Sequence, residues 1–493
     1  MRAIISWRAC AILVLSLLAA PQIASAHGRL KSSSPSAGAH LGTSPRELKL
    51  EFSEVPDLAF SRVKLLGPGG REITLGSLAY TAQSRRTLVA AIPGQLRAGT
   101  YVVQWQLAGD DGHPIRGNFE FVVAPGAMGT VSDTVGRGAA PAMMPMADSG
   151  ADSMAMHHDP ASMPEGNGFG AESPAYVVVR WVQFIALLLV IGTISFRQFV
   201  LSFLRRKEDP DSPMLDLAEA RAARVGHLAV AALVVTLVAR LIAQSYAMHG
   251  AADVWNATLS AQMIKNTVWG HGWLLQLAGV IVGGLGFHLA DRACRARGTH
   301  STAPVRPSYG WSLATVGALL LAFSAAFSGH ASAAPKLQVL AVIADGLHVL
   351  GASSWLGSLA LVLLAGLPAA ACLPEAERGP MVAELINAFS PVALMSAGVA
   401  TATGVFAAWL HVGAIPNLWG TRYGITLLVK LTVLGVVALT GFYNWRTVKP
   451  RLGTDAATHH LVRSARVEVT VAIIVLLVTA ILVASPTSMD ATM

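Results

Sequence analysis

The first histidine of the chain, His27, directly follows a segment that a signal peptidase would remove. Residues 1–26 contain Arg2 and Arg8, then an apolar run, then Ala24-Ser25-Ala26. This is the pattern of a secretory signal with an Ala-x-Ala cleavage site. Cleavage after Ala26 would make His27 the N-terminal residue, and its α-amine and imidazole together could then chelate a metal ion. We therefore predict a signal peptide over residues 1–26 and a metal ligand at His27.

A second group of ligands is predicted in the segment Asp110-Asp111-Gly112-His113-Pro114. Asp111 offers a carboxylate and His113 offers a second imidazole. Tetragonal ligation by nitrogen and oxygen is what Cu(II) prefers. The alternative interpretation is a histidine placed by chance and an ordinary Asp-Gly turn. The combination favours a Cu(II) site outside the cytoplasm.

Residues 125–172 have the composition of a linker and contain an unusual number of methionines. The segment is rich in Gly, Ala, Ser, Pro and Asp and has no apolar period, which predicts a flexible linker. A thioether is a soft ligand suited to Cu(I), and a linker has no core for methionines to fill. We therefore predict metal capture here, with compositional drift as the alternative. The candidate ligands are Met143, Met144, Met146, Met154, Met156, His157 and His158.

The overall composition is that of a membrane protein. Of the 493 residues, 53% are hydrophobic and only 13% are charged, which implies several membrane spans. The net charge of +8 does not indicate a nucleic-acid partner, because the basic residues fall largely in short loops between apolar runs. Cys10 belongs to the signal, and Cys294 and Cys372 lie in loops predicted to be cytoplasmic. The exported domain therefore has no disulfide and no thiolate ligand.

Residues 27–124 are predicted to form an all-β domain. Apolar and polar residues alternate over 48–52, 61–65, 101–107 and 118–122. Short strands punctuated by turns such as Gly67-Pro68-Gly69-Gly70 indicate an antiparallel sandwich.

Residues 173–487 are predicted to form an all-α polytopic membrane domain. Eight apolar runs are each long enough to cross a bilayer: about 176–200, 225–247, 267–290, 311–330, 337–367, 385–410, 423–445 and 467–485. An exported first domain makes the first span run inward, and basic residues then concentrate in the cytoplasmic loops. We therefore expect a bacterial inner-membrane protein whose N-terminal domain and C-terminus are both periplasmic.

Histidines gather at the external ends of these spans and suggest an entry path for an ion. His249, His271, His330 and His411 all lie at that face. Asp345 and His348 are three residues apart in the fifth span, on one helix face and a short way into the membrane. Ionisable groups at such depth usually face an interior path.

Other charged residues in the spans have less specific interpretations. We expect Arg180, Arg197 and Arg240 to extend toward lipid headgroups. Lys430 and Glu468 carry opposite charges and could form an ion pair inside the bundle.

The exported part and the membrane part each carry a series of short motifs. In residues 27–123 these are His27, Ser34-Pro35-Ser36-Ala37-Gly38-Ala39, Leu50-Glu51-Phe52-Ser53-Glu54, Gly99-Thr100-Tyr101-Val102-Val103-Gln104-Trp105, and Asp111-Gly112-His113-Pro114 with Gly117. In residues 176–486 these are Leu347-His348-Val349-Leu350-Gly351, Trp355-Leu356-Gly357-Ser358, Tyr423-Gly424, Lys430, Asn444, Arg463-Ser464, Glu468 and Ser485-Pro486. By these motifs the first part resembles the periplasmic copper-binding protein CopC and the second resembles the inner-membrane protein CopD, so the chain looks like a CopC–CopD fusion.

The resemblance implies a Greek-key sandwich that binds Cu(II) through His27, Asp111 and His113, with Glu54 as a further candidate ligand. Residues 27–124 contain no methionine, unlike CopC proteins with a methionine-rich Cu(I) loop, so the linker methionines could take over that role.

We expect capture of periplasmic Cu(II) and its delivery to a membrane pathway, in copper homeostasis or resistance. The expected partners are copper ions, the lipid bilayer and other periplasmic copper-handling proteins, without nucleic acid. No enzymatic reaction is expected, and no nucleotide-binding Gly-x-x-x-x-Gly-Lys-Ser/Thr motif is present. Three alternatives stay open: tethered sequestration without transport, a copper oxygenase, and a haem-carrying redox protein.

Overall fold

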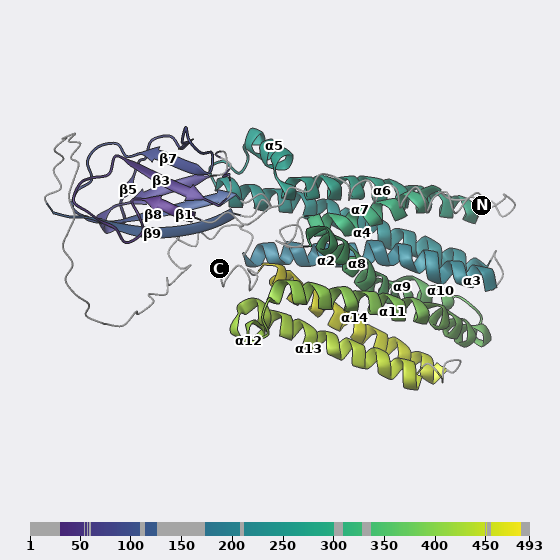
Figure 1. Ribbon diagram of the computed structural model, residues 1–493. Helices are drawn as coiled ribbons and strands as arrows, with labels where there is room; N and C mark the ends of the chain where they lie inside the picture. The colour runs from purple at the N-terminus through teal and green to yellow at the C-terminus, as the bar shows by residue number, and fades with distance from the viewer. Residues whose placement is uncertain are drawn as a thin grey trace. The chain divides into compact units, whose positions relative to one another are not determined.

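The computed structural model describes residues 30–53, 55–56, 58, 61–108, 114–125, 173–207, 212–299, 309–327, 337–448, 450 and 455–484. The chain divides into two compact units, a β-sandwich and a helical bundle (Figure 1).

The sandwich consists of two sheets whose strands alternate between buried and exposed residues. One sheet has the order β1 (Leu30–Ser34), β3 (Glu47–Phe52), β7 (Thr87–Ala91), β6 (Ala79–Tyr80). The other has the order β2 (His40–Leu41), β9 (Pro114–Val123), β8 (Gly99–Ala108), β4 (Arg62–Leu66), β5 (Glu72–Ile73). The predicted β-sandwich is thus confirmed. One pairing differs from the expected antiparallel pattern, because the two-residue edge strand β2 runs parallel to β9.

Large side chains from both sheets form the core of the sandwich. Leu48, Leu50 and Phe52 alternate along β3 and are buried. The ring of Phe52 meets that of Trp105 on β8 edge-on, with 5.4 Å between the centroids. Tyr101 on β8 donates its hydroxyl to the carbonyl of Arg97 at 2.7 Å, and burial raises the pKa of this phenol.

Seventeen helical elements follow, and some of them join end to end. They are α2 (Pro174–Ser195), η4 (Phe196–Leu201), α3 (Ser202–Lys207), α4 (Pro213–His249), α5 (Ala257–Asn266), α6 (Val268–Thr299), α7 (Tyr309–Phe327), α8 (Gln338–Ala352), η6 (Ser353–Gly357), α9 (Ser358–Leu361), η7 (Val362–Gly366), α10 (Leu367–Ala370), α11 (Glu375–Val412), α12 (Asn417–Gly420), α13 (Arg422–Tyr443), η8 (Asn444–Val448) and α14 (Asp455–Ala484), counted over the described residues. Within this part of the chain, eight helical stretches are long and apolar enough to cross a membrane, which confirms the predicted number of spans. The fifth stretch is interrupted by two π-helical segments, η6 and η7.

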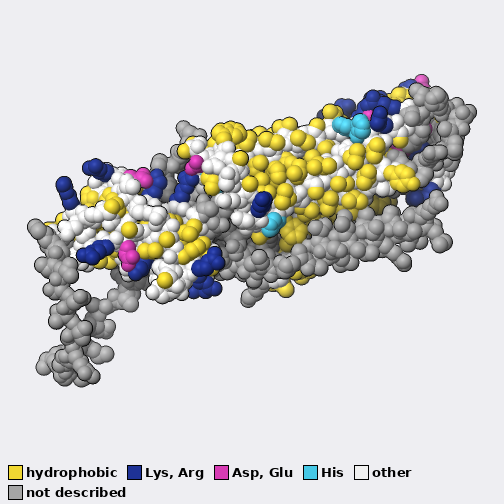
Figure 2. Space-filling view, turned by 90° about the horizontal axis from the view of Figure 1, so that it is seen from above, with side chains coloured by type: hydrophobic (Ala, Val, Ile, Leu, Met, Phe, Trp, Pro, Cys, Tyr) yellow, Lys and Arg dark blue, Asp and Glu magenta, His cyan; other side chains and the backbone are white. Residues whose placement is uncertain are grey.

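The outside of the helical unit is apolar. Leu228, Val235 and Leu394 expose more than two thirds of their surfaces, and Figure 2 shows a broad hydrophobic surface along this unit. Such a surface needs lipid in place of water. The helical unit is therefore a membrane domain.

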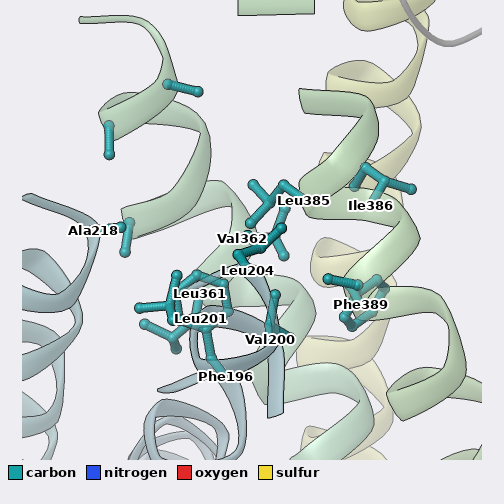
Figure 3. Close-up of a cluster of buried hydrophobic side chains, with 14 of the residues drawn as sticks. Phe196, Val200, Leu201, Leu204, Ala218, Leu361, Val362, Leu385, Ile386 and Phe389 are labelled. Carbon is teal, nitrogen blue, oxygen red and sulfur yellow. The ribbon is translucent and has the colours of Figure 1, made fainter. Parts of the chain in front are cut away.

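Small residues and apolar clusters hold the bundle together. A Cβ added at Gly192 of α2 would lie 2.4 Å from the carbonyl carbon of Gly357 in η6. Glycine therefore permits the close helix contact that stabilises bundles in lipid. One cluster joins η4, α3, η7 and α11 through Phe196, Leu201, Leu204, Val362 and Leu385 (Figure 3).

Arginines in the spans pack inside the bundle, so their predicted extension toward headgroups is wrong. Arg240 is only 6% exposed, donates to the side-chain oxygen of Gln276 at 2.5 Å and lies over the Trp269 ring. Arg180 lies over the ring of Tyr176, with 4.5 Å between the guanidinium carbon and the centroid. Arg197 lies over Trp311 and 3.7 Å from a carboxylate oxygen of Glu219. Most of these partners come from other helices, so hydropathy along one span could not reveal them.

Candidate copper sites

The four predicted Cu(II) ligands of the sandwich, His27, Glu54, Asp111 and His113, lie outside the described residues. The described residues next to them in the sequence belong to paired strands. Leu30, three residues after His27, pairs with Phe52, two residues before Glu54. Ala108 and Pro114, which flank the segment with Asp111 and His113, pair with each other.

These flanking residues meet at one end of the sandwich. Leu30 begins β1 and Phe52 ends β3, while Ala108 ends β8 and Pro114 begins β9. The contact between Phe52 and Trp105, three residues before Ala108, joins the two sheets at this end.

Other predicted ligands also lie outside the described residues. They are His330 and the linker residues Met143, Met144, Met146, Met154, Met156, His157 and His158.

Asp345 and His348 are both on α8, and both side chains are partly buried in the bundle. They follow the first residue of the helix, Gln338, by seven and ten residues. With a rise of 1.5 Å per residue, they lie about 11 and 15 Å along the helix. This depth is between a third and a half of a hydrocarbon core of about 30 Å.

A backbone carbonyl orients the imidazole of His348. Nδ1 is 2.9 Å from the carbonyl oxygen of Ala400 on α11 and 3.3 Å from Oγ1 of Thr403. Because a carbonyl only accepts, Nδ1 must carry a proton, and in the neutral imidazole Nε2 then keeps its lone pair. Metal-binding histidines are commonly oriented by such a hydrogen bond from the second nitrogen. The contact with Ala400 leaves Nε2 as the ring nitrogen that is not used in this hydrogen bond.

Two residues of α13 complete the surroundings of Asp345. Lys430 interacts electrostatically with Asp345 and with His348, and Tyr423 interacts with Asp345. The side chains of Asp345, His348, Tyr423 and Lys430 thus share one region of the bundle.

The suggested ion pair between Lys430 and Glu468 is wrong. Glu468 is 5% exposed and accepts a hydrogen bond from the side-chain amide of Asn444. Asn444 lies 14 residues beyond Lys430 along α13 and η8, a separation of about 21 Å in a helix. The two charges therefore lie at different depths.

The span-end histidines that the structure describes, His249, His271 and His411, do not join Asp345 and His348 in one site. His249 ends α4 and is buried, with Nδ1 3.3 Å from the Ser245 hydroxyl. His271, in the first turns of α6, is exposed and donates from Nε2 to the carbonyl of Lys265 at 3.0 Å. His411 lies in the last turn of α11. Among the described residues, no three His, Cys, Asp or Glu side chains gather closely enough for one metal ion.

Sequence reasoning missed the partners of Asp345 and His348. Ala400 contributes a backbone atom, which no side-chain pattern reveals. Lys430 had a signal, because it is the only lysine between 337 and 448. A lysine in the middle of an apolar span needs an anionic neighbour.

Three family models match consecutive parts of the chain. Residues 30–124 match the CopC domain. Residues 171–336 match the N-terminal domain of copper resistance protein D-like proteins, and residues 383–482 match copper resistance protein D.

Individual relatives carry copper-related names. The copper transport protein CutJ of Bacillus subtilis is 24% identical over 483 residues, covering 96% of this chain and 77% of the relative. Copper resistance protein C of Pseudomonas syringae pv. tomato is 35% identical over 106 residues, covering 20% of this chain and 83% of the relative. The crystal structure of PcoC, a methionine-rich copper resistance protein from Escherichia coli, is 35% identical, with a TM-score of 0.19, and the match covers 20% of this chain and 99% of that one.

Proposed function

Since the chain belongs to the CopC–CopD family of copper resistance proteins, we propose that it captures Cu(II) in the periplasm and delivers copper to a pathway through the inner membrane. Copper is the cargo of this process, and no bond is made or broken in an organic substrate. Other periplasmic copper-handling proteins would supply the ion.

The capture step is assigned to the sandwich. His27 supplies its α-amine and imidazole, His113 an imidazole and Asp111 a carboxylate, with Glu54 as a further oxygen ligand. The meeting of Leu30, Phe52, Ala108 and Pro114 at one end of the sandwich supports this assignment. The ligating nitrogens must be deprotonated, so acid releases the metal.

The observation that carries the membrane step is the orientation of His348 beside Asp345. With Nδ1 donating to Ala400, the neutral imidazole of His348 would offer the lone pair of Nε2 to copper, and the carboxyl group of Asp345 lies one helical turn away. The span-end residues His249, His271, His330 and His411 would pass copper toward this pair.

The linker over residues 125–172 would keep donor and acceptor in one molecule. A tether raises the effective concentration of the loaded sandwich at the membrane entrance, if its length permits contact. Its methionines and histidines are candidate ligands for copper that reaches the periplasm as Cu(I).

Copper accumulation in cells tests the proposal. Cells would express the wild type, His27→Ala or His348→Ala at equal membrane abundance. His460→Ala provides the control, because His460 is an exposed residue near the start of α14. We expect both test variants to lose most of the uptake and the control to keep it. If His27→Ala lowers uptake while His348→Ala does not, the protein is a tethered periplasmic binder without transport.

A further inference from the structure

Two histidines outside the proposed pathway lie close together on two neighbouring helices. The rings of His227 on α4 and His288 on α6 are 6.2 Å apart between centroids, and their planes are inclined by 57°. Both side chains are exposed.

The packing of α4 against α6 holds these two histidines at one level. A Cβ on Gly226 would lie 2.4 Å from the Phe287 ring, so this glycine lets the helices approach where Phe287 packs. The next residue on each helix is the histidine. Farther along the same antiparallel contact, the Trp273 indole donates to the carbonyl of Leu237 at 3.1 Å, which fixes the register.

The separation of the rings matches the span of a metal ion bound to both. A metal–nitrogen bond of about 2.0 Å, added to roughly 1.1 Å from nitrogen to ring centre, places each centroid about 3.1 Å from the metal. A linear arrangement thus separates the centroids by about 6.2 Å, and bent ones by less. Because both side chains are exposed, small rotations can aim their nitrogens at one ion. Imidazole is a good ligand for copper, and linear two-coordination is characteristic of Cu(I).

The site lies at the basic end of the bundle, defined here by Arg224 and Arg292. His227 precedes His249 by 22 residues on α4, and His288 follows His271 by 17 residues on α6. These intervals correspond to about 33 and 26 Å, close to the thickness of a hydrocarbon core. Figure 2 shows histidine side chains next to basic side chains at one end of the apolar surface.

We propose that His227 and His288 form a two-imidazole Cu(I) site at the end of α4 and α6 opposite His249 and His271. Its role as the station where copper leaves toward the cytoplasm rests on the proposed function, but the binding itself does not. Copper captured as Cu(II) reaches this site as Cu(I) after a cytoplasmic thiol donates one electron, and two such thiols are oxidised to one disulfide for every two copper ions.

Copper counting on the purified full-length protein tests this site. The chain would be placed in phosphatidylcholine nanodiscs, loaded anaerobically with Cu(I) and dialysed, and bound copper would be measured per chain. We expect His227→Ala, His288→Ala and the double variant each to lose the same single equivalent, because one ion needs both rings. Arg224→Gln is the matched control, since it removes a neighbouring charge on α4 and keeps both imidazoles.

Each other result overturns the proposal. Unchanged copper in the histidine variants means that the pair binds none. A double variant that loses twice as much as either single variant means two independent sites. Loss in Arg224→Gln as well assigns the effect to the basic surface and its lipid phosphates. A Soret band that disappears in His288→Ala identifies the ligand as haem. Since the measurement requires no transport, it separates this site from the uptake defect of His348→Ala.

Discussion

The two ring nitrogens of His348 differ because only one of them, Nδ1, donates a hydrogen bond to the carbonyl of Ala400. The hydrogen bond at Nδ1 fixes both the tautomer and the direction of the ring. Loss of such orienting contacts typically weakens metal binding about 10- to 100-fold. The contact with Ala400 is therefore expected to strengthen any metal binding at this ring.

A methyl group beside this ring should disturb it. A Cβ at Gly404 would lie 3.1 Å from Cε1 and 3.4 Å from Nδ1 of His348. We expect Gly404→Ala to lower copper uptake severalfold, toward the 10-fold end of the orienting effect, with normal membrane abundance. Gly398→Ala on the same helix meets nothing within 4 Å and should leave uptake unchanged. Equal uptake by the two variants would contradict the assigned role of the imidazole position.

At this scale the sequence predicts pairs within one helix better than pairs between helices. Asp345 and His348 share a face because of their spacing, and the structure places both in the bundle. Lys430 approaches them from α13, and this depends on how the helices pack. For the same reason, a charge-based pairing of Lys430 with Glu468 failed.

Strands β8 and β9 flank, in the sequence, the segment that contains Asp111 and His113. Their ten pairs run from Gly99↔Val123 to Ala108↔Pro114, so the segment between them starts from a long, regular ladder. Near this end Trp105 lies opposite Gly117. The indole occupies the space that a side chain at 117 would need.

Filling that space should destabilise the sandwich. A Cβ at Gly117 would lie 2.3 Å from Cζ2 of Trp105, and the ring is already packed against Phe52. We expect Gly117→Ala to lower the free energy of unfolding of the sandwich by about 1–3 kcal/mol. Pulse proteolysis of the full-length chain in urea measures this change. Gly42→Ala, where nothing lies within 4 Å, should shift the urea midpoint little, and a similar shift in both would refute the steric argument.

The same sheets show which strands a sequence can predict. The predicted segments 48–52, 61–65, 101–107 and 118–122 correspond to β3, β4, β8 and β9. β1 was missed because its sequence, Leu-Lys-Ser-Ser-Ser, contains a single apolar residue. β2, β5 and β6 have two residues each, too few to show an alternation. After its first residue, Thr87, β7 contains only apolar residues, so it shows no alternation of polar and apolar residues.

For the whole molecule, the eight spans and the distribution of basic residues predict one orientation in the membrane. Cys372 follows α10, is exposed, and lies in a connection predicted to be cytoplasmic. Ala251, after α4, is exposed in a connection predicted to be periplasmic.

Thiol labelling should reveal this orientation. In a Cys294→Ser background, we expect a membrane-impermeant maleimide to label Cys372 in inverted vesicles and not in intact spheroplasts. Ala251→Cys in a chain lacking Cys294 and Cys372 should show the opposite pattern. Labelling of Cys372 from outside would reverse the orientation, and His227 and His288 would then lie at the periplasmic face.

The π-helical segments η6 and η7 divide the fifth span into three α-helical parts. The side-chain faces of these parts do not continue one another. Each residue advances an α-helix by about 100°, and the wider π turn takes in an extra residue. The faces on either side of η6 are therefore out of phase. Asp345 and His348 belong to the part before it, whereas Leu359 and Leu361 behind it pack in an apolar cluster. Removing one residue from Ser353–Gly357 would restore a continuous helical phase and turn the polar face away from its neighbours, although the span would remain just as apolar and long enough to cross the bilayer.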